Sequence, residues 1–438
     1  MALAGIPGGG VGDCFVVEGG RPIEGVVSAS GNKNEALPVL AATLLAPGGC
    51  ALSNLPRIDD VATQLQLLRG LGVRVQAQKD GRELRVDSAA LGESAPDDEL
   101  GRKIRGSFLL APGLLHRTGR ALLPRPGGDR IGRRRIDTHL HALQLLGAQV
   151  ARRERHYELR LNGRFCGGDI FLDEASVMAT ENALMAAAVA TGRTRIANAA
   201  SEPHVQGLCR FLNAAGARIR GIGSNLLEIE GVPELSPAAH SIGPDHIEVG
   251  SFVAIAALTG GELRVRGVAA DDLRMILMVF ARLGVQARIE EGELLVPGKQ
   301  ELAVRDDLDG AIPTIGDSPW PGFPTDLSSI ALVLATQARG TVLIHEKMFE
   351  NRLFFVDRLI AMGARIVLCD PHRAVVSGPT QLHGDSISSP DIRAGMALLA
   401  AALCAEGRSV IMNAHQVDRG YERIDERLRR LGASIARV

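Results

Sequence analysis

The sequence predicts an α/β protein of two domains, built from six copies of one structural unit. The chain has 438 residues, which is too long for one ordinary hydrophobic core, so two or more domains are expected. One phrase, in which helical apolar spacing ends at a glycine and a strand-like alternation follows, occurs six times. A second phrase, a glycine turn before a short strand, precedes most copies. Three units per domain would let the apolar helices share a core inside the sheets, with a cleft between the domains.

The first phrase is expected to form a helix, a stop and a strand. A glycine after the last apolar residue of a helical pattern is a common left-handed helix cap. The copies read LQLLRGLGVRV (65–75), LHALQLLGAQV (140–150), LCRFLNAAGARI (208–219), MVFARLGVQARI (278–289), FFVDRLIAMGARI (354–366) and ERLRRLGASI (426–435). Their glycines are Gly72, Gly147, Gly216, Gly284, Gly363 and Gly432. Spacings of 68 to 79 residues suit a unit of two helices and several strands.

The second phrase is expected to end one helix and begin a strand. Its copies read LAPGGCALSN (45–54), ATGRTRIAN (190–198), LTGGELRVRG (258–267), ATQARGTVLIH (335–345) and CAEGRSVIMN (404–413). In each copy the apolar run stops at a glycine turn, and a short strand pattern follows.

The composition is that of a globular protein without a strong overall charge. The formal net charge is −1, so no global field favours nucleic acid or a membrane. Aromatic residues make up 3% of the chain, which leaves few platforms for stacking bases. The six cysteines include no CxxC pair, so neither a metal site nor a disulfide framework is expected. Without a signal peptide pattern or a bilayer-spanning apolar run, a cytoplasmic protein is expected.

The stretch PRPGGDRIGRRRID (124–137) places Asp129 between a Gly-Gly pair and a run of arginines. It has almost no apolar residues to bury, which is typical of a solvated loop. The other interpretation is a mobile lid over an anionic substrate, with an acid of its own. The stretch by itself leaves both open.

Further cations stand at expected turns and element ends. Lys33 begins an apolar helical pattern, where free N–H groups favour an anion, although an exposed turn lysine is the commoner case. The arginines in such places are Arg105, Arg134, Arg352, Arg393 and Arg419. Guanidinium groups bind phosphate and carboxylate through paired hydrogen bonds, but each arginine could equally form a surface ion pair.

Asp326 lies in WPGFPTDLSS (320–329), a stiff turn at an expected helix start. As the N-cap of that helix it would have a structural role. In a cleft, partial burial would raise its pKa and make it a general base. Both interpretations are open.

Nine motifs, in order and spacing, resemble the enolpyruvyl transferases, and within that family the enzymes whose acceptor is UDP-N-acetylglucosamine. They are GNKNEALP (31–38), RKIRGSF (102–108), PGGDRIGRRRID (126–137), SVMATEN (176–182), PDHIEVGSF (244–252), FPTDLSS (323–329), FENR (349–352), DIRA (391–394) and HQVDRGYERI (415–424). The resemblance extends from about Phe15 to Val438. It implies an inside-out α/β barrel in two domains, with the active site in the cleft between them. The implied domains are 33–243, carrying the mobile loop 124–137, and 1–32 with 244–438.

The resemblance also implies the reaction. The enolpyruvyl group moves from phosphoenolpyruvate to the 3′-hydroxyl of UDP-N-acetylglucosamine and phosphate leaves, the first committed step towards peptidoglycan. The two substrates are the implied partners, and no cofactor is implied. The oligomeric state is open, with a monomer favoured. Addition followed by elimination needs an acid, a base and cations that hold the substrate anions.

Motif by motif, the resemblance assigns the anions of phosphoenolpyruvate to cations of this chain. Lys33, Arg134 and Arg419 would bind the phosphate. Arg352 and Arg393 would bind the carboxylate.

The acceptor is assigned in the same way. Asn34 and Asp326 would face the sugar hydroxyls, with Asp326 as the base. The residues expected to line the sugar nucleotide are Arg105, Arg134, Arg135, Ile136, Asp137, Thr138, Glu174, Ala175, Ser176, Val177 and Met348.

Asp129 would complete a catalytic set with Lys33, Asp326 and Arg419. Most family members have cysteine at this place, and a branch has aspartate. The carboxyl group would protonate C3 of phosphoenolpyruvate once the loop closes over the substrates. Because the antibiotic fosfomycin alkylates the cysteine thiolate, an aspartate here implies an enzyme that is insensitive to it.

Five positions differ from common family patterns. Asn32, Arg135, Glu174, Met178 and His246 stand where Ala, Pro, Lys, Gly and Arg are usual. Glu174 reverses a charge in the nucleotide-contact segment. Two alternatives therefore stay open: transfer to another nucleotide such as UMP in secondary metabolism, or a non-catalytic paralogue that only binds a nucleotide.

Overall fold

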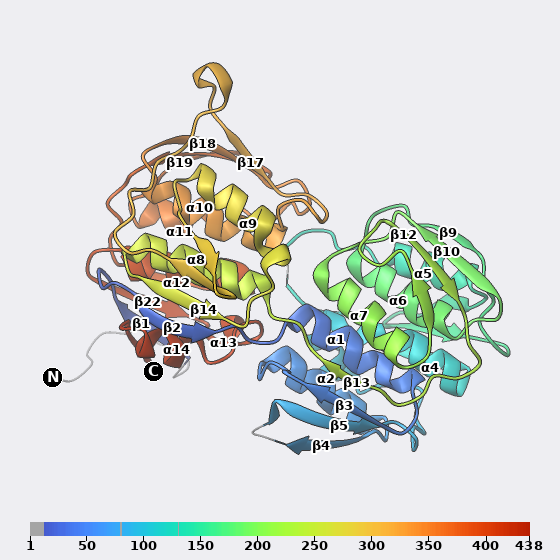
Figure 1. The fold of residues 1–438 in the computed structure, drawn as a ribbon. Helices are drawn as coiled ribbons and strands as arrows, with labels where there is room; N and C mark the ends of the chain where they lie inside the picture. The colour runs from blue at the N-terminus through green and yellow to red at the C-terminus, as the bar shows by residue number, and fades with distance from the viewer. Residues whose placement is uncertain (1–12, 79–80, 130) are drawn as a thin grey trace.

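The computed structural model describes residues 13–78, 81–129 and 131–438, which form two lobes (Figure 1). One lobe is made of residues 33–242. Its elements are α1 (Lys33–Ala42), η1 (Thr43–Leu45), β3 (Gly49–Ser53), α2 (Asp59–Gly70), β4 (Arg74–Gln78), β5 (Glu83–Asp87), α3 (Asp98–Lys103), η3 (Arg105–Leu110), α4 (Ala111–Thr118), β6 (Arg120–Pro124), α5 (Asp137–Leu145), β7 (Gln149–Arg152), β8 (His156–Arg160), β9 (Asp169–Phe171), α6 (Val177–Ala188), β10 (Arg193–Ala197), α7 (Pro203–Ala214), β11 (Arg218–Arg220), β12 (Leu226–Glu230) and β13 (Ala239–Ser241).

The other lobe combines the first strands with the second half of the chain. Its elements are β1 (Cys14–Glu18), β2 (Gly25–Ser28), α8 (His246–Thr259), β14 (Leu263–Arg266), α9 (Ala270–Arg282), β15 (Arg288–Glu290), β16 (Glu293–Val296), η4 (Leu308–Gly310), β17 (Thr314–Gly316), η5 (Thr325–Leu327), α10 (Ser328–Gln337), β18 (Gly340–His345), α11 (Val356–Ala361), β19 (Arg365–Asp370), β20 (Arg373–Gly378), β21 (Ser386–Ser388), α12 (Ile392–Cys404), β22 (Arg408–Met412), α13 (His415–Asp418), α14 (Ile424–Arg430) and β23 (Ser434–Arg437).

All six predicted glycine stops are confirmed. Each glycine lies two residues beyond the end of its helix, which is α2, α5, α7, α9, α11 or α14, and a strand begins within four residues of it. Their φ angles are 93° at Gly72, 103° at Gly147, 106° at Gly216, 87° at Gly284, 104° at Gly363 and 102° at Gly432. A left-handed backbone of this kind strains a residue that has a Cβ atom, which is why glycine stands at each stop.

The strands predicted from the second phrase are confirmed as β3, β10, β14, β18 and β22. The structure adds a further copy that the sequence analysis did not recognise. There α4 ends at Gly119, whose φ is 71°, and β6 follows. The strand phrase thus occurs in all six units.

In the described residues the strands form six small sheets, of which five are mixed sheets of four strands and one is an antiparallel sheet of three. β1 lies between β22 and β23 and is antiparallel to both, and β2 pairs parallel to β14. The strands before residue 30 therefore belong to the sheets of the second half, as predicted. In most strands buried and exposed residues alternate, as in β10, so one sheet face packs on helices and the other meets solvent.

Buried apolar residues form two clusters. One extends from Phe15 to Val27 and from Ile247 to Ile435, the other from Ala36 to Ile242. In the first, the apolar helices α8, α10 and α12 pack on one another; in the second, α6 packs against α4, α5 and α7, and α1 against α7. These contacts confirm the expectation that the apolar helices share a core.

The chain passes between the lobes at two segments that lie side by side. Asn32 N donates to Gly243 O at 2.7 Å, and Asp245 N donates to Ser30 O at 2.8 Å. Lys33 and the start of α1 therefore lie where the two lobes meet. Over the described residues, no helix is both long and apolar enough to cross a membrane.

Candidate functional site

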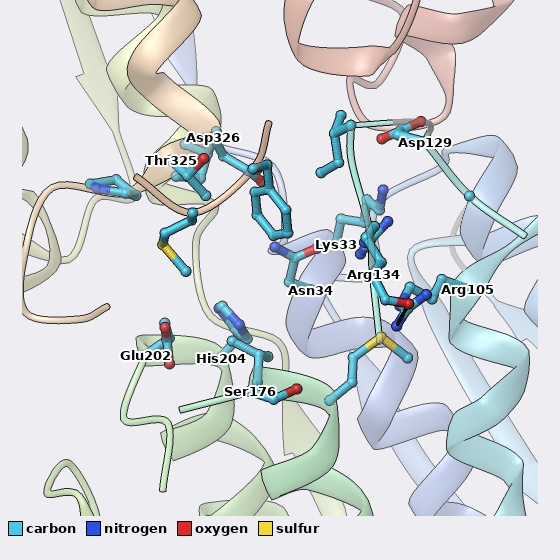
Figure 2. Close-up of a pocket in the computed structure, with 18 of the residues that line it drawn as sticks. Lys33, Asn34, Arg105, Asp129, Arg134, Ser176, Glu202, His204, Thr325 and Asp326 are labelled. Atoms are coloured by element: carbon cyan, nitrogen blue, oxygen red, sulfur yellow. Dashed lines mark hydrogen bonds between the residues drawn. The ribbon is translucent and has the colours of Figure 1, made fainter. Parts of the chain in front are cut away.

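A pocket of about 490 Å³ is lined by residues of both lobes (Figure 2). It brings together most of the residues that the sequence analysis selected, from segments far apart in the chain. They are Lys33, Asn34, Arg105, Asp129, Arg134, Arg135, Glu174, Ala175, Ser176, Val177, Asp326, Met348, Arg352, Arg393 and Arg419. Ile136, Asp137 and Thr138 were expected in the lining and are not part of it. They begin α5 just behind the wall, where Thr138 is buried.

Lys33 and Asn34 enter the pocket because α1 begins there. The Asn32 side chain caps this helix, and its Oδ1 accepts from the backbone N–H of Asn34 at 2.8 Å and of Glu35 at 3.3 Å. Free N–H groups and a positive helix end thus stand beside the Lys33 ammonium. The expectation of a helix start at Lys33 is confirmed, although the lysine is buried rather than exposed.

Four charged side chains of alternating sign line one side of the pocket, and we call them the alternating cluster: Lys33, Asp60, Arg419 and Asp129. Lys33 Nζ lies 2.8 Å from Asp60 Oδ2, and Arg419 Nε lies 3.1 Å from Asp60 Oδ1. Arg419 Nη1 lies 2.6 Å from Asp129 Oδ1. Burial alone would raise the pKa of Asp60, but Lys33 and Arg419 hold it below its usual range. Asp60 was not selected from the sequence.

The loop 124–137 carries Asp129 to this cluster and is itself held against the other lobe. Asn351 N donates to Ile131 O at 3.0 Å, and Arg133 N donates to Glu350 Oε2 at 3.1 Å. Gly132 has φ 135°, and a Cβ atom there would meet a Glu350 carboxylate oxygen at 2.1 Å. Glycine is therefore required for this close contact. The position over the pocket supports a lid, whereas the loop's mobility stays a prediction.

Arg105 and Arg134, the arginine pair, line the pocket near the alternating cluster. Arg105 Nη2 donates to the backbone oxygens of Arg134, at 3.2 Å, and Arg135, at 2.7 Å, so it orders the loop. Burial and the charge of Arg134 lower the pKa of Arg105 to about 10, and burial lowers the pKa of Arg134. Within the part of the chain that the structure describes, no ion pair joins either arginine to an acid. An anionic ligand would therefore be favoured here.

Asp326 is held by the two arginines expected to bind a carboxylate. Its Oδ1 lies 2.6 Å from Arg352 Nη2 and its Oδ2 2.7 Å from Arg393 Nη2. Arg352 and Arg393 are 2% and 4% exposed, so these are not the surface ion pairs considered above. Arg352 Nη1 has no hydrogen-bond acceptor among the described residues and lies 4.0 Å from Asp391 Oδ1. A second carboxylate could satisfy that nitrogen.

Two expectations for Asp326 are wrong in the ligand-free structure. Asp326 lies within η5, and the cap of α10 is Leu327, without a side-chain bond, so Asp326 is not an N-cap. Burial alone would raise the pKa of Asp326, as expected, but Arg393, Arg352 and Lys33 together lower it well below its usual range. The carboxylate is ionised and strongly held, which makes it a weak base in this state.

The rim near the loop end carries exposed charges. Arg135 Nη2 lies 2.9 Å from Asp173 Oδ2 and its Nε 3.4 Å from Asp137 Oδ2. The hydroxyl of Thr138 donates to Asp173 Oδ1 at 2.6 Å. Asp137 and Thr138 therefore orient Arg135 and Asp173, rather than line the pocket themselves.

The sequence analysis did not recognise the wall formed by α6 and α7. Glu181, Glu202 and His204 line the pocket there and have side-chain atoms without hydrogen-bond partners among the described residues. Burial and the charge of Glu202 raise the pKa of Glu181 well above its usual range, and burial lowers the pKa of His204 to about 3. Figure 2 shows Glu202 and His204 apart from Arg105 and Arg134. This wall is mostly uncharged and suits hydroxyl or amide groups better than phosphate.

Comparisons with known proteins agree with this geometry. The family model of EPSP synthase (3-phosphoshikimate 1-carboxyvinyltransferase) matches residues 17–428. The chain is 53% identical to the UDP-N-acetylglucosamine 1-carboxyvinyltransferase of Treponema denticola, over 96% of this chain and 98% of that protein. It is also 53% identical to the protein of that name from Bradyrhizobium diazoefficiens, over 97% and 98%.

Solved structures give the same result for the fold. The enolpyruvyl transferase NikO from Streptomyces tendae superposes with a TM-score of 0.87 at 25% identity, covering 98% of this chain and 99% of that one. EPSP synthase from Acinetobacter baumannii has a TM-score of 0.75 at 18% identity, covering 97% and 100%, and shows the fold alone. The fold, the pocket and the sequence matches lead to one conclusion: the chain belongs to the EPSP synthase family of enolpyruvyl transferases.

Proposed function

We propose that the protein transfers the enolpyruvyl group of phosphoenolpyruvate to the 3′-hydroxyl of UDP-N-acetylglucosamine in the synthesis of peptidoglycan precursors. The observation that carries this is the 53% identity, over nearly the whole length of both chains, to enzymes named for that reaction. The alternative of another nucleotide acceptor is less well supported, because the relatives that share 53% of their sequence with this chain are named for UDP-N-acetylglucosamine. The alternative of a non-catalytic paralogue is disfavoured because acids and cations suited to the chemistry gather in one pocket.

The reaction is an addition followed by an elimination. C3 of phosphoenolpyruvate takes a proton while the acceptor oxygen bonds to C2 and gives its own proton to a base. The bond from C2 to the phosphate oxygen then breaks, one C3 proton leaves, and inorganic phosphate is released. The residues must therefore hold three anionic groups and assist three proton transfers.

The phosphate of phosphoenolpyruvate is assigned to Lys33, Arg134 and Arg419. The start of α1 adds a positive helix end beside Lys33. Arg134 has no acidic partner among the described residues, so a phosphate would supply its missing counter-charge. When Arg419 turns to the phosphate, its contact with Asp129 weakens, and Asp129 can then take and deliver a proton.

The carboxylate of phosphoenolpyruvate is assigned to Arg352 and Arg393. In the ligand-free structure Asp326 occupies both guanidinium groups, at 2.6 and 2.7 Å. A substrate carboxylate that shares these arginines would weaken their hold on Asp326. Asp326 would then become a better base for the acceptor hydroxyl, with Asn34 beside it.

The sugar nucleotide is assigned to the arginine pair, the rim and the wall of α6 and α7. Arg105 and Arg135 are assigned to the diphosphate and the uracil end, with Asp137 and Thr138 acting through Arg135. The Glu174–Val177 segment and Met348 line the same pocket. The uncharged wall suits the polar groups of the sugar.

We further assign this protein to the branch that has Asp129 in place of cysteine, and we expect it to be insensitive to fosfomycin. A carboxylate is a far poorer nucleophile towards an epoxide than a thiolate. The domains are proposed as 33–243 and 1–32 with 244–438, each an inside-out barrel of three units with the site in the cleft. The two clusters of buried apolar residues support these bounds. A cytoplasmic location stays a prediction.

Phosphate release tests the proposed function. The purified protein is given phosphoenolpyruvate with UDP-N-acetylglucosamine, UMP or shikimate 3-phosphate in parallel. Turnover is expected with UDP-N-acetylglucosamine. Turnover with UMP alone would assign the protein to secondary metabolism, and tight nucleotide binding without turnover would support the non-catalytic paralogue.

A further inference from the structure

Two acidic side chains beside the pocket have no part in the assignments above: Asp317 and Glu346. They directly follow β17 and β18, which pair in parallel with Gly316 opposite His345, so both carboxyl groups meet at the same sheet edge. Both are buried, at 1% and 0% exposed. Burial and the neighbouring Asp317 carboxyl group raise the pKa of Glu346, so the two groups act on each other.

In the described part of the chain, each of the two buried carboxyl groups has one oxygen without a hydrogen-bond partner, which one shared proton would satisfy. Asp317 Oδ2 and Glu346 Oε2 have no donor among the described residues. An ionised carboxylate only accepts hydrogen bonds, so two of them can be bonded to each other only if one is protonated. Close carboxyl groups in a buried place share one proton because two like charges there repel each other.

The remaining oxygens of the two side chains hold the segment that carries the proposed base. Glu346 Oε1 accepts from the hydroxyl of Thr325 at 2.8 Å, and Asp317 Oδ1 accepts from the backbone N–H of Lys347 at 2.5 Å. Thr325 directly precedes Asp326, and its hydroxyl also lies 3.5 Å from Arg352 Nε. The acid pair is thus linked to both partners of the Asp326–Arg352 contact.

The charged groups around the pair explain why loss of its proton would disturb the contact between Arg352 and Asp326. Burial and the Asp317 carboxyl group raise the pKa of Glu346 to about 8, while Arg352 lowers it. The ring of His372, from the turn between β19 and β20, contacts Glu346 O at 2.7 Å, and Lys347 follows next in the chain. If the pair lost its proton, the new charge on Glu346 would attract Arg352, the cation whose charge acts on that carboxyl group. Arg352 would then be drawn away from Asp326 and from the substrate carboxylate.

We propose that Asp317 and Glu346 share one proton and together act as positioning residues that set Thr325, Asp326 and Arg352 for binding the carboxylate of phosphoenolpyruvate. The inference rests on the proposed function through the role of Arg352. It predicts that KM for phosphoenolpyruvate rises as the pair loses its proton at alkaline pH. KM for the sugar nucleotide should change little, because the pair does not contact that part of the pocket.

Glu346→Gln tests the pair with a neutral side chain of the same shape, whose amide can donate to Asp317 and accept from Thr325. We expect nearly wild-type kinetics at about pH 7, and no alkaline rise in KM for phosphoenolpyruvate. The wild type should show a rise of several-fold between about pH 7 and about pH 9.5. Glu406→Gln, the same carboxyl-to-amide change at an exposed position of the same lobe, is the matched control and should follow the wild type.

Asp317→Asn should have the opposite effect on the charge of Glu346 from Glu346→Gln. Its amide would donate to Glu346 and leave Glu346 ionised, so KM for phosphoenolpyruvate should already be raised at about pH 7. Equal pH profiles of KM for the wild type and Glu346→Gln, or a normal KM in Asp317→Asn at neutral pH, would overturn the proposal.

Thermal unfolding tests the shared proton without any turnover. Because the folded pKa of Glu346 lies above its unfolded value, the wild type should lose stability relative to Glu346→Gln as pH rises from about 5 through about 8. Parallel Tm curves for the two proteins would refute the shared proton. If that difference is present but no acceptor is turned over, the proposed function fails and the acid pair remains.

Discussion

The alternating cluster and the arginine pair line the same pocket but differ in how their charges are balanced. In the alternating cluster each cation has a carboxylate oxygen within 3.1 Å. The arginine pair has no such partner among the described residues, and burial lowers the pKa of both guanidinium groups. The charges of the alternating cluster are therefore balanced within the protein. Burying the arginine pair costs free energy, and a bound anion would offset that cost. The comparison indicates that a bound anionic substrate stabilises the arginine pair more than the alternating cluster.

The largest expected effect comes from the acid at the end of the alternating cluster. Asp129→Asn keeps a hydrogen-bond acceptor for Arg419 but has no acidic proton for C3. Turnover should fall roughly 10²- to 10⁴-fold, the usual contribution of a general acid, while nucleotide binding persists. Phosphate release and nucleotide titration measure the two effects. Asp169→Asn, at an exposed strand of the same lobe, is the control. Near-normal turnover of Asp129→Asn would return Asp129 to a solvated-loop role.

Asp129→Cys restores an acid of a different kind at the same place. It should retain activity and gain time-dependent inactivation by fosfomycin, strongest with the sugar nucleotide present. Residual activity and intact mass after incubation measure this. A covalent adduct on the wild-type protein would contradict the assignment of Asp129.

The arginine pair should show the next largest effect. Arg134→Ala removes a buried cation that forms no direct ion pair among the described residues, so the folded protein should lose little stability. KM for phosphoenolpyruvate should rise roughly 10- to 100-fold through the loss of a charge-assisted contact. Steady-state kinetics with thermal unfolding measures both quantities. A large loss of stability with unchanged KM would mean that the arginine is balanced by groups of the protein itself.

Asp60→Asn tests the balance of the alternating cluster. It removes the carboxylate charge that pairs with both Lys33 and Arg419, and should cost about 2 kcal/mol of unfolding free energy. Because the folded pKa of Asp60 is lowered, its contribution is present above the unfolded pKa and is lost as pH falls through the folded value. Denaturant unfolding at neutral and at acid pH measures this. An equal difference between variant and wild type at both pH values would argue against the ion pairs as its source.

The smallest effect is expected at the rim. Arg135→Ala removes exposed ion pairs to Asp173 and Asp137, so the stability of the folded protein should change little. KM for the sugar nucleotide should rise modestly, and more at low salt than at high salt. Kinetics at two ionic strengths measure the effect. A loss as large as that of Arg134→Ala would place a main anion contact at the rim.

The fold could be predicted because its signals are local. Gly72 and its five counterparts mark helix stops through their own backbone, so the repeat is visible in the sequence. Asp60 could not be predicted, because an acid in the first turn of α2 is typical of any helix start. Its partners Lys33 and Arg419 come from other elements. The pKa of Asp326 was predicted to rise but is lowered, for the same reason: the arginines that hold Asp326 are distant in the chain.

The acid pair is a second case in which residues that meet in the fold could not be paired from the sequence. Asp317 and Glu346 belong to no motif, and only the parallel pairing of β17 and β18 brings them together. The walls of the pocket follow the same rule: segments such as Glu174–Val177 were located from a motif, whereas Glu181 and Glu202 were missed because a buried acid has no local signature.

The proton transfer from Asp129 is tested most directly by hydrogen exchange at C3. The enzyme is incubated with phosphoenolpyruvate and UDP-N-acetylglucosamine in deuterium oxide, and the reaction is stopped before completion. Deuterium at C3 of the recovered phosphoenolpyruvate and of the product is then measured by mass spectrometry. The account predicts deuterium with the wild type and Asp129→Cys, and none above background with Asp129→Asn, although that variant still binds the nucleotide. Exchange in Asp129→Asn at the wild-type rate would show that another group delivers the proton.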